Sequence, residues 1–389
     1  MNKPPVVFIA GERQHAGKTV TSLGVISAIS KIIDPQDIGY FKPVGQEMIT
    51  LSNGHKIDKD VRIVKEFSGL DMPDMGMMSP VRVVSGVTKE YIMGSNQKEI
   101  TAQFEKNIHE TLESLSNKKL IIAEGTGHPG VGSVVGLSNA RVANLLDAKI
   151  LYLVGGGIGR TLDELEVDLS YFSHHHSRVA GILFNKVLPK KLDSMAEVLT
   201  ENALNRIFSE WDPALKVFGY MPTVKYLNNP SMNLISQSFK GHRIIKDGKC
   251  ADAWHQPCRK VKIISQDIDV FHPEKSLRPR DIAVLASGSH RRLKRIAEYN
   301  NSLSGEKLGG IIITCATDQR PDKESTQYLE NSGLPCIAVW QDTADADALL
   351  YKCFSNTKLQ LYDQLKHKSI VDLFEEHFDA ERFIKSFGL

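Results

Sequence analysis

Short apolar runs rich in valine and isoleucine alternate along the chain with longer amphipathic stretches. Continuous apolar runs of this length are typical of buried parallel strands. The first half of the sequence has six of them, at residues 6–10, 38–44, 119–125, 149–157, 179–187 and 217–222. Between them, residues 18–31 and 97–116 carry apolar side chains at helical spacing. Strands that alternate with helices predict an α/β fold with a doubly wound parallel sheet.

A second α/β block follows a break in this pattern. Asn-Asn-Pro at 228–230 is typical of a loop. Four further strand candidates come after it, at 259–266, 280–287, 308–316 and 335–341. Phenylalanine and leucine then recur at helical spacing toward the end of the chain. We therefore predict a large domain over 1–225, a smaller α/β domain over 226–345 and a helical C-terminal segment over 346–389.

Composition narrows the class of protein. The 389 residues are 41% hydrophobic, which is enough for a large core, and the net charge of +2 provides no field that favours nucleic acid or a membrane. The apolar runs are shorter than the ~18 residues that a membrane span needs. The first residues lack the long apolar region of a signal peptide, and the five cysteines have no framework spacing. We expect a cytoplasmic protein that binds neither nucleic acid nor membrane.

The segment GERQHAGKTVTSLG, residues 11–24, directly follows the first predicted strand. It ends its turn in Gly-Lys-Thr, as a phosphate-binding loop does, although five residues rather than four separate Gly11 from Gly17. In such a loop, backbone N–H groups and the start of a helix bind phosphate. Lys18 can reach the terminal phosphates, and the Thr19 hydroxyl can ligate Mg²⁺.

Two charged residues lie at the ends of other predicted strands. Glu124 ends one strand and precedes a turn rich in glycine. A carboxylate there lies where ligands bind in parallel sheets, and Mg²⁺ prefers oxygen ligands. Lys42, in FKPVGQ, lies at the end of another strand and precedes a proline. Taken alone, Lys42 could equally be a surface charge.

These motifs resemble dethiobiotin synthetase, whose phosphate loop also has five intervening residues. The segments FKPVGQ, IDKDVRIVKE, GGGIGRTLDE and GILFNKV more closely resemble the dethiobiotin-synthetase-like module at the N-terminus of long phosphate acetyltransferases. Residues 226–345 resemble the DRTGG domain that follows this module, although the family's Thr-Gly-Gly is Thr314-Cys315-Ala316 here. We find no counterpart of the acetyltransferase catalytic domain, so we do not expect acetyl transfer by this chain alone.

The resemblance implies a site for Mg²⁺ and ATP. Lys18 would hold the β- and γ-phosphates, and Lys42 would face an acidic substrate or the transferred phosphoryl group, so both are the expected catalytic residues. The metal would lie near Thr19, Asp60 and Glu124, with Asp58 as the alternative to Asp60. The expected nucleotide-binding residues are Gly11, His15, Ala16, Gly17, Lys18, Thr19, Val20 and Asn185.

Asn185 ends a predicted strand, and the resemblance implies that it reads the base. Its amide offers one donor and one acceptor, which match N7 and the N6 amino group of adenine. We therefore predict adenine as the base. The alternative is that Asn185 only caps the following turn.

Two functions remain open at this stage. The first is a regulatory or unassigned role for an ATP-binding or ATP-hydrolysing protein, which would form a homodimer and serve a separate partner enzyme. The second is an ATP-dependent ligase that phosphorylates a carboxylate or carbamate of a small acidic substrate. Gly-Thr-Asp-Thr opens the loop of dethiobiotin synthetase, whereas Gly11-Glu12-Arg13-Gln14 opens it here. This departure on the substrate side favours the regulatory role.

Overall fold

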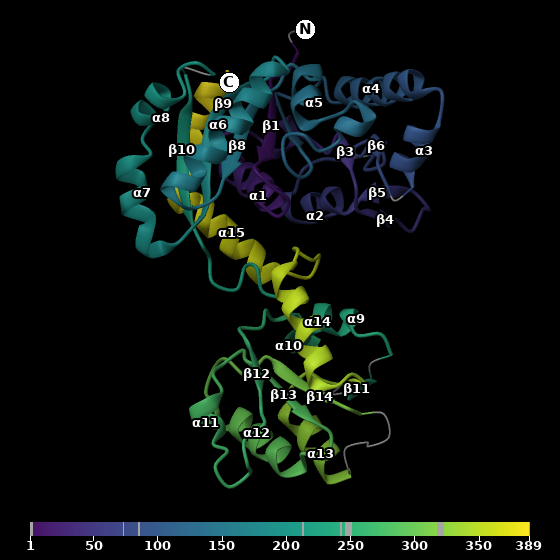
Figure 1. The fold of residues 1–389 in the computed structure, drawn as a ribbon, viewed down its shortest axis with the longest axis vertical. Helices are drawn as coiled ribbons and strands as arrows, with labels where there is room; N and C mark the ends of the chain where they lie inside the picture. Colours follow the sequence, from purple (N-terminus) through teal and green to yellow (C-terminus); the bar gives the residue numbers. More distant parts are fainter. Residues whose placement is uncertain are drawn as a thin grey trace. The chain divides into compact units, whose positions relative to one another are not determined.

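The computed structural model describes residues 3–72, 74–84, 86–211, 214–241, 243–245, 251–316 and 323–388. The chain divides into two compact units, which Figure 1 shows. The first consists of Met1–Val224 and His367–Leu389, and the second of Lys225–Lys366.

The first unit is built on a six-stranded parallel sheet. Its order is β10-β9-β8-β1-β7-β2, so the chain extends first to one side of β1 and then to the other. The strands are β1 (Val6–Gly11), β2 (Ile38–Phe41), β7 (Leu120–Glu124), β8 (Lys149–Val154), β9 (Arg178–Val187) and β10 (Lys216–Pro222). The six predicted strands and the doubly wound α/β fold are therefore confirmed.

Helices and two small sheets complete this unit. The helices are α1 (Lys18–Ile29), α2 (Lys59–Ser68), α3 (Val87–Met93), α4 (Gln97–Ser114), α5 (Asn139–Leu145), α6 (Ile158–His174), α7 (Leu192–Val198), α8 (Glu201–Ile207) and α16 (Ala380–Phe387). The short strands are β3 (Val44–Gly45), β4 (Met48–Thr50), β5 (Lys56–Asp58) and β6 (Val81–Arg82). Three 3₁₀ turns lie at Pro35–Asp37, Ser133–Val135 and Pro189–Lys191.

Helix α1 is buried on most of its sides. It contacts β1 and β7 on the sheet and also α2 and α16. Buried side chains therefore do not form a single stripe: Thr21, Ser22 and Leu23 are all buried although they are consecutive. A helix enclosed in this way fixes the loop that precedes it, because its first turn cannot shift without disturbing the core.

The second unit has a five-stranded sheet with helices on both faces. Its order is β11-β15-β14-β13-β12, and all pairs except β11·β15 are parallel. The strands are β11 (Arg243–Ile245), β12 (Val261–Ile263), β13 (Ile282–Ala286), β14 (Gly310–Thr314) and β15 (Cys336–Ala338). The helices are α9 (Met232–Ser238), α10 (Ala251–His255), α11 (Pro273–Ser276), α12 (His290–Ser302), α13 (Lys323–Ser332) and α14 (Thr343–Ser355).

Two apolar clusters fill the space between this sheet and its helices. One joins the sheet to α12 and α13 through Leu293, Ile296 and Leu329, and the other joins it to α9 and α14. Figure 1 shows α11–α13 and α9, α10 and α14 on opposite sides of the strands. The sequence predicted the four parallel strands but not β11, which pairs antiparallel with β15 at the edge of the sheet.

The sequence predicted a single helical segment over residues 346–389, but this segment is divided between the two units. Helix α14 packs on the second sheet, whereas α16 contacts α1 in the first unit. Helix α15 (Gln364–His377) contains the division between the units, after Lys366. The reason is aromatic packing, since Phe218 of β10 contacts the rings of Phe378, Phe383 and Phe387.

We predict that limited proteolysis cuts the chain near residues 225–229. The first unit ends at Val224, and the residues that follow, up to Asn229, are exposed or only half-buried. Mass spectrometry of the fragments would identify the cut. Early cleavage confined to residues 3–222 would contradict a boundary at this place.

Candidate functional site

The carboxyl ends of neighbouring strands bring the predicted site residues to one edge of the first sheet. Gly11 ends β1, Glu124 ends β7, Lys42 follows β2, and Asn185 lies near the end of β9. The strand order reverses at β1, which has β7 on one side and β8 on the other. Ligands of doubly wound sheets bind at such a reversal.

The phosphate loop runs from Gly11 to the first turn of α1. His15 and Ala16 lie in the loop, Gly17 precedes the helix, and Lys18, Thr19 and Val20 form its first turn. No side chain accepts a hydrogen bond from the first N–H groups of this helix. The start of a helix with such N–H groups attracts anions.

Lys18 is held between the phosphate loop and the turn that follows β7. Its Nζ donates to the carbonyl oxygens of Arg13 at 3.1 Å and Gly127 at 2.9 Å. Burial lowers the pKa of Lys18 to about 8, and the charge of Glu124 opposes this shift. Two neutral carbonyls compensate an ammonium less well than an anion does, so phosphate oxygens would be better partners.

Glu124 is almost fully buried and accepts hydrogen bonds from three hydroxyls. Thr19 Oγ1 donates to Oε1 at 2.8 Å, and Ser22 Oγ and Tyr40 OH donate to Oε2 at 2.8 and 2.9 Å. Burial and then the nearby Asp60 carboxylate raise the pKa of Glu124 to about 7. Because Thr19 gives its hydrogen to Glu124, the lone pairs of its oxygen remain for a cation.

Lys42 forms a buried ion-pair cluster with two carboxylates. Its Nζ lies 3.0 Å from Asp58 Oδ1 and also contacts Asp60 Oδ2. Burial would lower the pKa of Lys42, but Asp60, Glu124 and Asp58 together raise it. The ammonium therefore stays charged, and its charge is already balanced within the protein.

The two aspartates differ in what they can still bind. Asp58 has no exposed side-chain surface, and its oxygens accept from Lys42 Nζ and from the backbone N–H groups of Gln46, Glu47 and Asp60. Asp60 keeps 23% of its side chain exposed. The hydrogen-bonding capacity of Asp58 is thus used inside the fold, whereas Asp60 can accept a further ligand.

The amide of Asn185 is engaged at both ends. Nδ2 donates to Ala16 O at 2.8 Å, and Oδ1 accepts from Lys186 N at 2.9 Å. The side chain therefore contacts the phosphate loop itself. Whether Asn185 also reads adenine stays a prediction.

Residues 6–231 match the AAA domain family (AAA_26), and this match covers more than half of the chain. The chain belongs to this family. Its first unit accordingly contains a P-loop NTPase domain, to which a nucleotide is the expected ligand.

Three solved structures are similar to this member of the AAA domain family. The ParA family ATPase from Chlorobium tepidum TLS is 13% identical, with a TM-score of 0.32, over 57% of this chain and 86% of that one. A chain of the MinC:MinD cell division protein complex from Aquifex aeolicus is 12% identical, with a TM-score of 0.32, over 57% of this chain and 83% of that one. The CBS and DRTGG domains of the regulatory region of Clostridium perfringens pyrophosphatase are 13% identical, with a TM-score of 0.24. The match covers 32% of this chain and 46% of that one, so this chain spans less than half the length of that chain.

Several residues that shape the site of the AAA domain were not predicted from the sequence. Ser22 lies one helical turn after Thr19, so the two share a face of α1, and helical spacing could have revealed it. Tyr40 lies in β2, two residues before Lys42, but nothing local in the sequence connects it to Glu124. Glu12 accepts from Gly155 N at 2.9 Å and pairs with Arg13 at 3.2 Å, which ties the loop to the end of β8.

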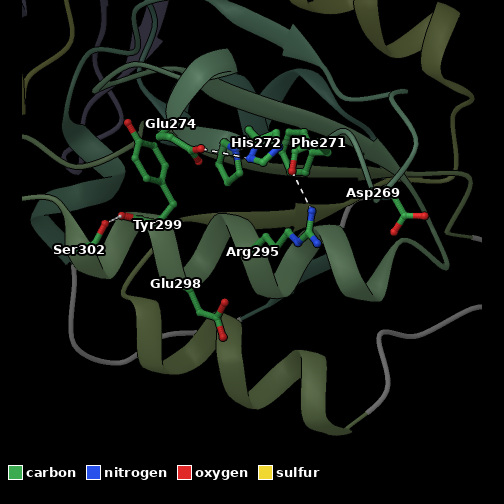
Figure 2. Close-up of a pocket in the computed structure, with 9 residues that line it drawn as sticks. Asp269, Phe271, His272, Glu274, Arg295, Glu298, Tyr299 and Ser302 are labelled. Carbon is green, nitrogen blue, oxygen red and sulfur yellow. Dashed lines mark hydrogen bonds and ion pairs between the residues drawn. The ribbon is translucent and has the colours of Figure 1, made fainter.

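An open pocket of about 540 Å³ lies in the second unit, outside the AAA domain match, and Figure 2 shows its lining. Its polar groups are largely paired within the protein: Arg295 donates to Phe271 O at 2.9 Å, and His272 lies 3.2 Å from Glu274. None of the predicted site residues lies there.

Among the described residues, no helix has the length and apolar character needed to cross a bilayer.

Proposed function

We propose that the first unit binds Mg²⁺ and ATP on residues 11–19 and that this binding serves a regulatory role. The observation that carries the proposal is the position of Lys18, which bridges the phosphate loop and the turn after β7 through Arg13 O and Gly127 O. A terminal phosphate bound at the start of α1 would replace these carbonyls. The loop and the turn would then be joined by the nucleotide, so binding can change how they are arranged.

Magnesium fits the oxygen donors at this place. The Thr19 hydroxyl lies against Glu124, and the charge of Asp60 acts on that same carboxylate. Hydroxyl and carboxylate oxygens are the ligands that Mg²⁺ prefers. Thr19, Asp60 and Glu124 would hold the ion, which would neutralise phosphate charge. In the described part of the chain, no group of three or more His, Cys, Asp or Glu residues is arranged as a metal site by itself.

The regulatory role is favoured over a ligase by the state of Lys42. A ligase of this kind needs a free cation to bind an acidic substrate, and Asp58 and Asp60 already balance the charge of Lys42. On the other side of the loop, Glu12 and Arg13 pair with each other. Both groups expected to face a substrate are thus engaged within the protein.

One observation favours the ligase as a second candidate. The charge of Lys42 lowers the pKa of Lys18, although less than burial does, so the two ammonium groups act on each other electrostatically. Two cations close together could neutralise a phosphoryl group in transfer. ADP release measured with and without small carboxylates and bicarbonate separates the two functions, because only a ligase is stimulated.

The finer relationships are also proposals. We propose that the first unit is dethiobiotin-synthetase-like and that the second is a DRTGG-like domain, on the motifs quoted above. The same resemblance supports a homodimer and a separate partner enzyme. Sedimentation of the purified protein would test the dimer.

We predict that Lys18→Ala weakens ATP binding about ten- to a hundredfold. Hydrogen bonds to charged groups contribute roughly 1.5–3 kcal/mol, and Lys18 would make them to the phosphates. Isothermal calorimetry with Mg²⁺ and ATP measures the change, and Lys98→Ala, an exposed lysine of α4, is the control. A folded Lys18→Ala protein with unchanged affinity would exclude the proposed site.

A further inference from the structure

Two adjacent carbonyl groups of the phosphate loop are each held by a side chain from the end of β9. Asn185 Nδ2 donates to Ala16 O at 2.8 Å, and Lys186 Nζ donates to His15 O at 2.7 Å. These two side chains come from a strand more than 160 residues further along the chain. Neither interaction was expected from the sequence.

The direction of these carbonyls determines where the N–H groups of the loop point. In a trans peptide, the carbonyl oxygen and the following N–H point in opposite directions. Because the oxygens of His15 and Ala16 face β9, the N–H groups of Ala16 and Gly17 point away from it. Ala16 N–H donates to Arg13 O at 3.3 Å, so this N–H points into the loop, toward the same carbonyl that accepts from Lys18 Nζ.

The backbone at this point is unusual and needs support. His15 has a φ of 61° and Gly17 a φ of 102°, both in the left-handed region. That region is unfavourable for histidine. Gly17 also lies so close to β9 that a Cβ on it would be 2.6 Å from Asn185 Nδ2. Residues 15–17 of the loop therefore pack against the end of β9, which stabilises their backbone conformation.

We propose that Asn185 and Lys186 are positioning residues that turn the N–H groups of residues 16 and 17 toward the bound phosphates. This proposal rests on the proposed nucleotide site. It assigns Asn185 to the phosphate part of the ligand and not to the base, because one N–H of its amide holds Ala16 O and its carbonyl oxygen accepts from Lys186 N. Loss of either side chain would lower the affinity for any triphosphate, whatever base it carries.

The experiment compares three probes on the full chain: Mg²⁺ with ATP, with GTP and with inorganic tripolyphosphate, which has no base. We expect Asn185→Leu to weaken all three by a similar factor, roughly threefold to tenfold, the range for one lost hydrogen bond. Asn185→Asp has nearly the same shape but places an acceptor against Ala16 O, so it should weaken all three at least as much. Thermal unfolding without ligand checks that each variant is folded.

Lys186 allows an independent test, in which a second substitution should restore the lost affinity. Lys186→Met keeps most of the side chain but removes the donor to His15 O, and we expect it to weaken the three probes together. Lys186→Arg restores a donor and should recover most of the affinity. Lys190→Met, which removes an exposed lysine just beyond β9, is the matched control and should bind as the wild type does.

The outcomes separate this inference from the proposed function. If Asn185→Leu weakens ATP alone and leaves tripolyphosphate binding unchanged, Asn185 reads the base and the inference is wrong. Unchanged affinity for all probes in both Asn185 variants also overturns it. If the wild type binds none of the three probes, the proposed function itself fails.

Discussion

Asp58→Ala should lower the free energy of unfolding by about 3–5 kcal/mol, which is the loss typical of removing one partner of a buried ion pair. The Asp58 side chain has no exposed surface, and it compensates the buried ammonium of Lys42 at 3.0 Å. The substitution also leaves the N–H groups of Gln46 and Glu47 without their acceptor.

Asp60→Asn is the matched control for this prediction. Asp60 also contacts Lys42, but part of its side chain is exposed, and Asp58 would still compensate the ammonium. We expect it to lose less than half as much stability, and instead to weaken the Mg²⁺ dependence of nucleotide binding. Urea unfolding of both variants measures the difference. Equal losses would show that the two carboxylates do not divide structural and ligand-binding roles in this way.

A second large effect is expected in the pH dependence of stability. Burial raises the pKa of Glu124 from 4.5 to about 7, so the folded protein keeps a proton that the unfolded chain has already released. Between these pH values, the free energy of unfolding falls as pH rises, because the unfolded chain binds fewer protons than the folded one. Below pH 4.5 and above pH 7 this contribution no longer changes. The total is roughly 3 kcal/mol, since one pKa unit corresponds to about 1.4 kcal/mol.

Glu124→Gln removes this titration and should reveal it. Without nucleotide, we expect the variant to gain stability relative to the wild type between pH 4.5 and 7 and to keep that gain above pH 7. Urea unfolding at a series of pH values measures it, and Glu113→Gln, an exposed position on α4, is the control. Parallel curves for the wild type and Glu124→Gln would show that Glu124 titrates normally in the folded protein.

Much of the first unit could be predicted because its signals are local. Parallel strands that are buried on both faces need continuous apolar runs, and each of the six runs became a strand. The loop was recognisable because glycine, lysine and threonine must stand next to each other at the start of a helix. The expected residues Lys42, Glu124 and Asn185 all lie at one edge of the sheet, because parallel strands end on the same side.

The roles of individual side chains were less predictable. Asp58 and Asp60 are both acidic and two residues apart, so the sequence left them as alternatives. In the fold, Asp58 precedes α2 and accepts from backbone N–H groups, whereas Asp60 lies in the first turn with part of its surface open. Tyr40 is an apolar strand residue by its pattern, and only the pairing of β2 with β7 places its hydroxyl on Glu124.

The sequence by itself determined the α/β class, the strands, the phosphate loop and the residues that end the strands, because each depends on neighbours a few positions away. Only the tertiary structure decided which distant groups meet. The order of the strands brings β9 to the back of the loop, so that Asn185 and Lys186 hold its carbonyls. The rings of Phe383 and Phe387 in α16 pack against Phe218 of β10, which is another contact between residues far apart in the sequence. Periodicity specifies which face of an element is buried but not which other element covers it.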